Sequence, residues 1–304
     1  MRTFAGPDGA VNDVAFSPDG RYVAAACSNR KVFVFDRDSG EVKGRLELPK
    51  VDYQIVGVGF RTPAELILVS DDGKVVIRDW AREANLMSVP LILPGRNAKL
   101  AAHAFSAAGD IIAVGGPGTP AYVIFPKSKQ ASARTLAGGG GGLNGVAISA
   151  GGTMVLVSGA DARVRVYAFP GGNLLRNLSA EGNDPARAAV FSPDDSRVAA
   201  ILGSQRVQVW DLRTAERVRS LGHAVHPEFY DLAFTPDGGR LVTVNSFGTL
   251  KVWDVESEKP VYESPPSAVA GSQMGPLALS PDGRFAVTGS DRGEVRLWRL
   301  PDAD

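Results

Sequence analysis

Short apolar runs return along the whole chain at a nearly constant spacing. In each repeat a large apolar residue, here called the anchor, closes the first run, and successive anchors lie 43 to 45 residues apart: Phe16, Phe60, Phe105, Ile148, Phe191, Phe234 and Leu279. A second large residue follows each anchor by 18 to 20 positions: Phe35, Arg78, Phe125, Tyr167, Trp210, Trp253 and Trp298. Because both spacings persist to the end, the chain is interpreted as seven copies of one unit.

Each unit predicts four short strands. An apolar run such as residues 11–17 leads into a Ser-Pro-Asp-Gly turn, in which proline presets φ and glycine accepts a positive φ. The second run is β-branched (242–244), the third alternates apolar and polar residues (250–253), and the fourth is the most polar (217–221). Rising polarity is typical of a sheet whose fourth strand forms an exposed rim. The pattern therefore predicts an all-β fold, a seven-bladed β-propeller of four-stranded antiparallel blades.

The two ends of the chain each hold part of one unit. Residues 2–6 nearly duplicate residues 134–138, a predicted fourth strand, and Phe4 and Leu136 both precede the next anchor by twelve positions. Trp298 is followed by only six residues, too few for a fourth strand in the last unit. We therefore predict that residues 1–6 supply the outer strand of the last blade. Residues 1–304 then form a single closed propeller without unpaired sheet edges where the ends meet.

The sequence resembles the WD-repeat β-propeller family over essentially its whole length. The resemblance rests on the dipeptides Trp210-Asp211 and Trp253-Asp254, the Gly222-His223 pair and the recurring Ser-Pro-Asp-Gly turns. Several units keep only part of the motif, at Phe35-Asp36, Arg78-Asp79, Phe125, Tyr167 and Trp298-Arg299.

The resemblance has two implications. Family blades often hold a buried hydrogen-bonded tetrad of His, Asp, Ser or Thr, and Trp. Here His223 and Trp253 share a blade, but Phe247 stands at the position of the turn Asp, so we expect an incomplete tetrad and a stability that rests on apolar packing. Family members also often bind partners on the narrow face, which is formed by the loops before the first strands and between the second and third strands.

Composition narrows the range of functions. Lys plus Arg equals Asp plus Glu, 33 of each, so bulk charge provides no attraction to nucleic acid or to an anionic membrane. No apolar run has the length of a membrane span. The single cysteine, Cys27, excludes an internal disulfide and fits a reducing compartment, so we expect a cytoplasmic protein.

The residue before each anchor is nearly always small: Ala15, Gly59, Ala104, Ala147, Val190, Ala233 and Ala278. Sheets converge toward the axis of a propeller, so these positions are interpreted as sites of close contact between blades. These positions therefore indicate how the blades pack, and they do not indicate a catalytic or binding site.

Few residues suggest catalysis or metal binding. His223 and His226 form a His-x-x-His pair near Glu228, but no wider ligand cluster accompanies them, and we predict no metal, cofactor or catalytic residue. Asp13 and Asp231 both lie three positions before their anchors, where paired carboxylates bind a cation or act as acid and base, or where each has only a structural role. The alternative function is therefore a small-molecule enzyme, such as a sugar-lactone hydrolase, with Asp13, Asp231, His103 and Arg187 near the axis.

The favoured prediction is a non-enzymatic scaffold, itself monomeric, that binds a protein or peptide. Residues four positions before the anchors are expected to point toward the narrow face: Asn12, Val56, Ala101, Asn144, Arg187, Tyr230 and Gly275. Arg187 and Tyr230 belong to neighbouring blades and are residue types enriched at binding hot spots, and Phe247 adds an apolar contact nearby. Arg96, Asn97 and Lys99 are predicted to form a basic rim on the other side of the ring. A permanent place in a larger complex is equally compatible with this pattern.

Overall fold

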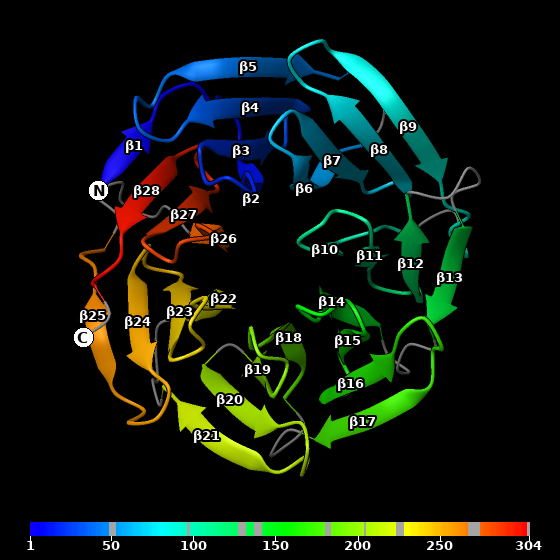
Figure 1. Ribbon diagram of the computed structural model, residues 1–304, viewed down its shortest axis with the longest axis vertical. Helices are drawn as coiled ribbons and strands as arrows, with labels where there is room; N and C mark the ends of the chain where they lie inside the picture. Colours follow the sequence, from blue (N-terminus) through cyan, green and yellow to red (C-terminus); the bar gives the residue numbers. More distant parts are fainter. Residues whose placement is uncertain are drawn as a thin grey trace.

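The chain folds into seven four-stranded antiparallel sheets that stand around a central axis (Figure 1). This computed structural model describes residues 1–48, 53–95, 98–126, 132–136, 142–179, 184–203, 205–222, 228–266 and 274–302. The chain travels once around the ring, so that its blue first strand lies beside its red last blade in Figure 1. The predicted all-β, seven-bladed propeller is confirmed.

In blades 1 to 6 the strands follow one another from the axis to the rim. Blade 1 holds β2 (Val11–Phe16), β3 (Tyr22–Cys27), β4 (Lys31–Asp36) and β5 (Val42–Glu47). Blade 2 holds β6 (Ile55–Thr62), β7 (Glu65–Ser70), β8 (Lys74–Asp79) and β9 (Ala84–Pro90). Blade 3 holds β10 (Ala102–Phe105), β11 (Ile112–Gly115), β12 (Ala121–Phe125) and β13 (Ser132–Leu136).

The second half of the ring repeats this arrangement. Blade 4 holds β14 (Leu143–Ile148), β15 (Met154–Gly159), β16 (Arg163–Ala168) and β17 (Leu174–Ser179). Blade 5 holds β18 (Ala186–Phe191), β19 (Arg197–Leu202), β20 (Arg206–Asp211) and β21 (Arg217–Leu221). Blade 6 holds β22 (Phe229–Phe234), β23 (Arg240–Asn245), β24 (Leu250–Asp254) and β25 (Pro260–Glu263). Blade 7 holds β26 (Met274–Leu279), β27 (Phe285–Ser290), β28 (Val295–Arg299) and, at its rim, β1 (Arg2–Phe4).

The ring closes as the sequence predicts. Strand β1 pairs antiparallel with β28, with Arg2 opposite Leu297 and Phe4 opposite Val295. The Phe4 side chain is only 2% exposed and stacks on the ring of Phe35 in blade 1, with 4.9 Å between the ring centroids. The N-terminal strand therefore completes the sheet of blade 7 and also packs against blade 1.

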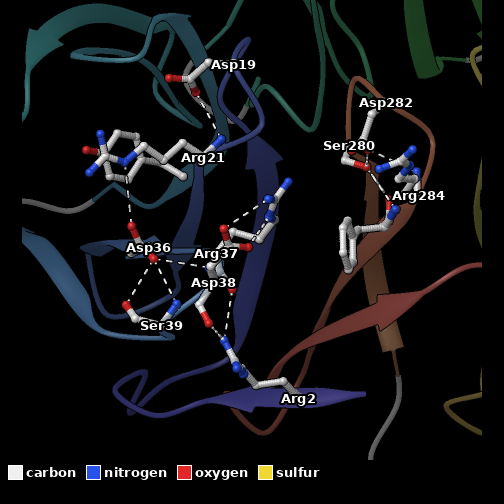
Figure 2. A network of polar contacts seen from close by, with 12 residues as sticks. Arg2, Asp19, Arg21, Asp36, Arg37, Asp38, Ser39, Ser280, Asp282 and Arg284 are labelled. Carbon is white, nitrogen blue, oxygen red and sulfur yellow. Dashed lines mark hydrogen bonds and ion pairs between the residues drawn. The ribbon is translucent and has the colours of Figure 1, made fainter.

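Polar contacts reinforce this seam (Figure 2). The Arg2 guanidinium donates hydrogen bonds to the main-chain carbonyls of Arg37 and Asp38, in the turn between β4 and β5 of blade 1. The Arg37 guanidinium binds the Asp38 carboxylate and lies over the Phe285 ring of blade 7, 4.9 Å from its centroid. These contacts thus join blade 1 to blade 7.

The core is divided among the spaces between blades. Each of the seven pairs of neighbouring blades encloses its own cluster of buried apolar residues among those that the structure describes. An anchor packs toward the preceding blade, as Phe60 does against Ala24 and Leu46 of blade 1. Alternate residues of an innermost strand therefore face opposite neighbours, as the two-residue period of a β-strand requires.

The small residues before the anchors lie where the next blade approaches. A methyl group placed on Gly59 would stand 2.4 Å from the Phe105 side chain, which is the anchor of blade 3. Ala147 likewise belongs to the apolar cluster between blades 4 and 5, together with Phe191. The steric explanation given for these positions agrees with this packing.

Enlarging Ala147 is expected to overpack the space between blades 4 and 5. We expect Ala147→Leu to reduce the free energy of unfolding by about 1–3 kcal/mol, because the surrounding side chains are already closely packed. Urea denaturation measures this change, and Ala84→Leu, at an exposed position of β9, is the matched control. Equal losses in both variants would contradict the assignment of Ala147 to a tight contact.

Two blades contain part of the polar tetrad that the family resemblance implies. The indole Nε1 of Trp253 donates to Thr243 Oγ1 at 2.9 Å, and that of Trp298 donates to Thr288 Oγ1 at 3.0 Å. Phe247 occupies the turn position expected for the Asp, and His223 lies outside the described residues. Of the tetrad, the described residues of each of these blades contain one Trp–Thr hydrogen bond, next to an apolar cluster.

Candidate functional site

Three of the predicted partner-binding residues come together on one side of the ring. Asn144, Arg187 and Tyr230 are each the second residue of an innermost strand, β14, β18 and β22 in blades 4, 5 and 6. Equivalent register positions on neighbouring blades lie at the same end of the ring. With Ala160, Pro185 and Ala188, these three residues line a concavity of about 510 Å³.

Arg187 presents its charge at the mouth of this concavity. Its side chain is 47% exposed, and the Glu228 carboxylate lies 3.9 Å from its guanidinium, longer than a well-formed hydrogen bond. The Arg187 main chain is held in place because its carbonyl accepts a hydrogen bond from the Ser158 hydroxyl of blade 4 at 3.0 Å. The Arg187 guanidinium therefore extends from a fixed backbone toward solvent.

Tyr230 adds aromatic surface beside Arg187, and Phe247 adds it on a turn that contacts the start of the Tyr230 strand. Tyr230 is half-buried and packs at the edge of the apolar cluster between blades 6 and 7. Phe247, in the turn between β23 and β24, is 58% exposed. This turn lies next to the start of β22, because the Ser246 N–H donates to the Glu228 carbonyl at 2.8 Å. An exposed phenylalanine ring on an ordered turn offers apolar contact area to a partner.

The turn that carries Phe247 is held by its own hydrogen bonds. The Asn245 side-chain oxygen accepts the N–H groups of Phe247 at 3.0 Å and of Thr249 at 3.1 Å. Asn245 is buried, so this loop has a defined shape.

Asn12 and Asn144 also connect blades, which the sequence analysis missed. The Asn12 amide donates to the Ile55 carbonyl of blade 2 at 2.8 Å, and the Asn144 amide donates to the Ala186 carbonyl of blade 5 at 3.0 Å. Both residues stand four positions before an anchor and form the same contact with the next blade. The recurrence of asparagine at one repeat position was the signal for this structural role.

The predicted basic rim is described only at Lys99, because Arg96 and Asn97 lie outside the described residues. The Lys99 ammonium binds the Asp71 carboxylate at 2.6 Å, and this hydrogen bond, with the charge of Asp71, raises the pKa of Lys99. Asp71 also accepts the Gln54 N–H at 2.9 Å. Lys99 is therefore not an unpaired positive charge on this rim, because its ammonium group already binds a carboxylate.

The second group of candidates meets at the axis. A central cavity of about 780 Å³ is lined by the innermost strands, and Asp13, His103 and Asp231 all lie on its wall. Arg187, the fourth residue proposed for an axial site, is absent from this wall and belongs to the concavity described above.

Asp13 and His103 are in direct contact although they belong to blades 1 and 3. The imidazole Nε2 lies 2.7 Å from Asp13 Oδ2, which also accepts the Val58 N–H of blade 2 at 2.6 Å. Gly57 of blade 2 makes this reach possible, since a Cβ at that position would stand 2.6 Å from His103 Cγ. The missing side chain leaves the space in which the imidazole crosses blade 2.

Burial and charge change the proton affinities of these groups. Burial alone lowers the pKa of His103, but the charge of Asp13 and the hydrogen bond with it more than offset this effect and raise the pKa above its ordinary 6.5. Burial raises the pKa of Asp231 to about 7, although the N–H groups of Leu277 and Leu232, each at 2.9 Å, act in the opposite direction.

The arrangement of His103 does not suit acid–base catalysis in the cavity. Its Nε2 is bound to Asp13, and its Nδ1 is buried next to Gly57 without a hydrogen-bond partner. A general base needs a nitrogen within hydrogen-bond reach of a substrate proton, and neither nitrogen is so placed. Cys27 is buried, and burial raises the pKa of its thiol to about 12, which disfavours the nucleophilic thiolate.

Metal binding finds little support in the described part of the chain. Within those residues, no three His, Cys, Asp or Glu side chains are grouped so that they could hold a metal ion. The His223–His226 pair of the sequence analysis lies outside them. The same residues contain no helix with the length and apolar character of a membrane span.

Comparison with known families identifies the repeat. Residues 1–36 and 277–299 match the family model of the WD domain, G-beta repeat. The first segment comprises β1 and the first three strands of blade 1, and the second comprises the second half of β26 with β27 and β28. No curated protein matches the chain. The protein is thus a seven-bladed β-propeller in which the segments on both sides of the closing seam are similar to the WD domain, G-beta repeat.

Proposed function

We propose that the protein is a non-enzymatic scaffold that binds a protein or peptide with the surface formed by Asn144, Arg187, Tyr230 and Phe247. We call this surface the blade 4–6 face. The observation that carries the proposal is that Asn144, Arg187 and Tyr230 line one concavity, with the exposed Phe247 on a turn that contacts the start of the Tyr230 strand. WD40 propellers commonly serve as protein-interaction scaffolds, which supports the same conclusion.

The chemistry of the blade 4–6 face suits a peptide segment. Tyrosine and arginine contribute large contact areas and hydrogen bonds, and both are enriched among residues that dominate binding energy. Hydrogen bonds from Ser158 and Asn144 hold the blade 5 backbone on either side of Arg187. Since these bonds exist before a partner arrives, binding loses less conformational entropy than it would on a mobile loop.

The scaffold is proposed to act as a monomer in the cytoplasm. The single cysteine is buried and forms no disulfide, which fits a reducing compartment. The equal numbers of basic and acidic residues favour a protein or peptide partner over nucleic acid or an anionic membrane. The axial cavity is the remaining place for small-molecule enzymology, and the buried nitrogens of His103 weigh against that alternative.

Removing the two central side chains of the blade 4–6 face is expected to weaken partner binding. The double variant Arg187→Ala/Tyr230→Ala is expected to weaken binding at least tenfold, since truncating a hot-spot residue typically costs more than about 1 kcal/mol. Affinity capture from the native cell extract with quantitative mass spectrometry identifies the partner. Calorimetry with the purified partner then measures the dissociation constants.

The matched control changes the same kinds of side chain on the rim of blade 2. Arg82 and Leu86 are both exposed, and the Arg82→Ala/Leu86→Ala variant is expected to bind like the unmodified protein. A partner that binds both double variants equally well would overturn the assignment of the blade 4–6 face. Steady hydrolysis of a lactone by the purified protein would overturn the non-enzymatic role.

A further inference from the structure

The contact between His103 and Asp13 joins blades 3 and 1, which are not neighbours in the ring. Position 103 lies two residues before its anchor, where the other blades carry aliphatic residues: Val14, Val58, Val146, Ala189, Leu232 and Leu277. Position 57 lies three residues before its anchor, and its glycine leaves room for the imidazole. The imidazole therefore passes over blade 2 and reaches the carboxylate of blade 1.

We propose that His103 and Asp13 form a proton-dependent latch across blade 2, which stabilises blades 1 to 3 in mildly acidic solution and weakens as the pH rises. Within this latch Asp13 Oδ2 accepts two hydrogen bonds, one from the Val58 N–H and one from His103 Nε2. Protonation of the imidazole places a positive charge on the donor of the second bond, so that this bond becomes an ion pair with the Asp13 carboxylate as well as a hydrogen bond. The latch is independent of the partner-binding role.

The groups that act on the His103 imidazole are few. Among the described residues, the charges that affect it are those of Asp13 on β2 and of Asp231 on β22. The strands packed against β10, namely β6, β11 and β14, present apolar side chains or glycine in this region, including Gly57, Val114 and Val146. Burial is thus the largest influence on the pKa of His103, and the Asp13 carboxylate is the main charge that opposes it.

The direction of the pH effect follows from the shifts in pKa. The pKa of His103 is raised in the folded protein, so the stabilisation is complete below the unfolded value of 6.5 and is lost as the pH rises through the folded value. The pKa of Asp231 is also raised, from 3.8 to about 7, so its contribution declines between these two values. Both groups therefore favour the folded state at the acidic end of this range.

The latch is tested by titrating the imidazole in the intact protein. Proton–carbon NMR resolves the His103 signal among the three histidines, and its loss in His103→Val assigns it. We expect the His103 pKa to lie above 6.5 in the unmodified protein. In Asp13→Asn we expect it below 6.5, because burial then acts without the opposing carboxylate. Asp231→Asn is the matched control and is expected to lower it less.

Stability measurements provide the second readout. The melting temperature of the unmodified protein is expected to fall as the pH rises from about 5 to 9. In His103→Val we expect a smaller fall over the same range. This variant inserts the residue that blades 1, 2 and 4 carry at the same position, which favours folding. If Asp13→Asn fails to fold, Gly57→Ala replaces it, since the added methyl group displaces the imidazole. A His103 pKa at or below 6.5 in the unmodified protein, or unchanged in Asp13→Asn, would overturn the latch.

Discussion

A protein that lacks residues 1–6 is expected to melt roughly 10 °C below the full chain. The deletion removes β1, exposes the edge of β28 and uncovers the Phe35 ring, which stacks on Phe4. Loss of a buried phenylalanine alone typically costs about 3–5 kcal/mol, and 1 kcal/mol corresponds to roughly 1.6 °C for a chain of 304 residues. Loss of the β1–β28 pairing adds to this effect. The exposed β28 edge also offers unpaired N–H and carbonyl groups, so aggregation on heating is expected.

Single substitutions separate packing from strand pairing at the seam. Phe4→Ala keeps the backbone of β1 but leaves a cavity beside Phe35. We therefore expect this substitution to lower the melting temperature by most of the amount that the deletion does. Thr3→Ala changes an exposed side chain on the same strand and is expected to have little effect. Differential scanning calorimetry compares the melting temperatures of the deletion variant and the two substituted proteins with that of the full chain. A deletion variant that melts with the full chain would show that β1 does not close the ring.

Substitution of Gly59 by alanine is expected to reduce the free energy of unfolding by about 1–3 kcal/mol. The new methyl group would lie 2.4 Å from the Phe105 side chain, a distance at which one of the two blades must move. Gly59 is on the innermost strand β6, and Phe105 is the anchor of the next blade. Phe105 also packs against the apolar cluster between blades 2 and 3, so that its displacement would disturb further contacts. Guanidinium denaturation measures the loss.

A second glycine on an innermost strand supplies the control for Gly59. Gly275 is on β26, and a methyl group there meets no atom within 4 Å. Gly275→Ala is expected to leave stability unchanged or to raise it by about 0.4–1 kcal/mol, because alanine restricts the unfolded chain. A comparable loss in both variants would mean that the cost at Gly59 comes from the backbone rather than from contact with Phe105.

The repeat period predicted the fold because each blade is built from local patterns. Strand alternation, turn residues and the spacing between Phe16 and Phe35 are properties of one unit, and seven similar units have one common way to bury their faces. The duplicated segment at Arg2–Phe4 predicted ring closure for the same reason. The Arg2 and Arg37 contacts at the seam could not be predicted in this way, because they depend on turns whose side chains vary between units.

The sequence predicted where the residues of the candidate site lie, but it did not predict all the contacts that they form. Register alone placed Asn144, Arg187 and Tyr230 at one end of neighbouring blades, and these residues line one concavity. Register did not reveal that Asn12 and Asn144 donate hydrogen bonds to the next blade. A repeat position fixes where a side chain begins, whereas its partner depends on which carbonyl the neighbouring blade presents.

The sequence by itself determined the number of blades, the order of their strands and the joining of the ends. These features follow from periodicity, turn chemistry and apolar alternation, which act within a few residues of one another. Only the tertiary structure decided that His103 meets Asp13, because this contact needs the ring to bring blades 1 and 3 together and needs a glycine between them. Distances between side chains of different blades depend on the curvature of the closed ring, which no single repeat encodes.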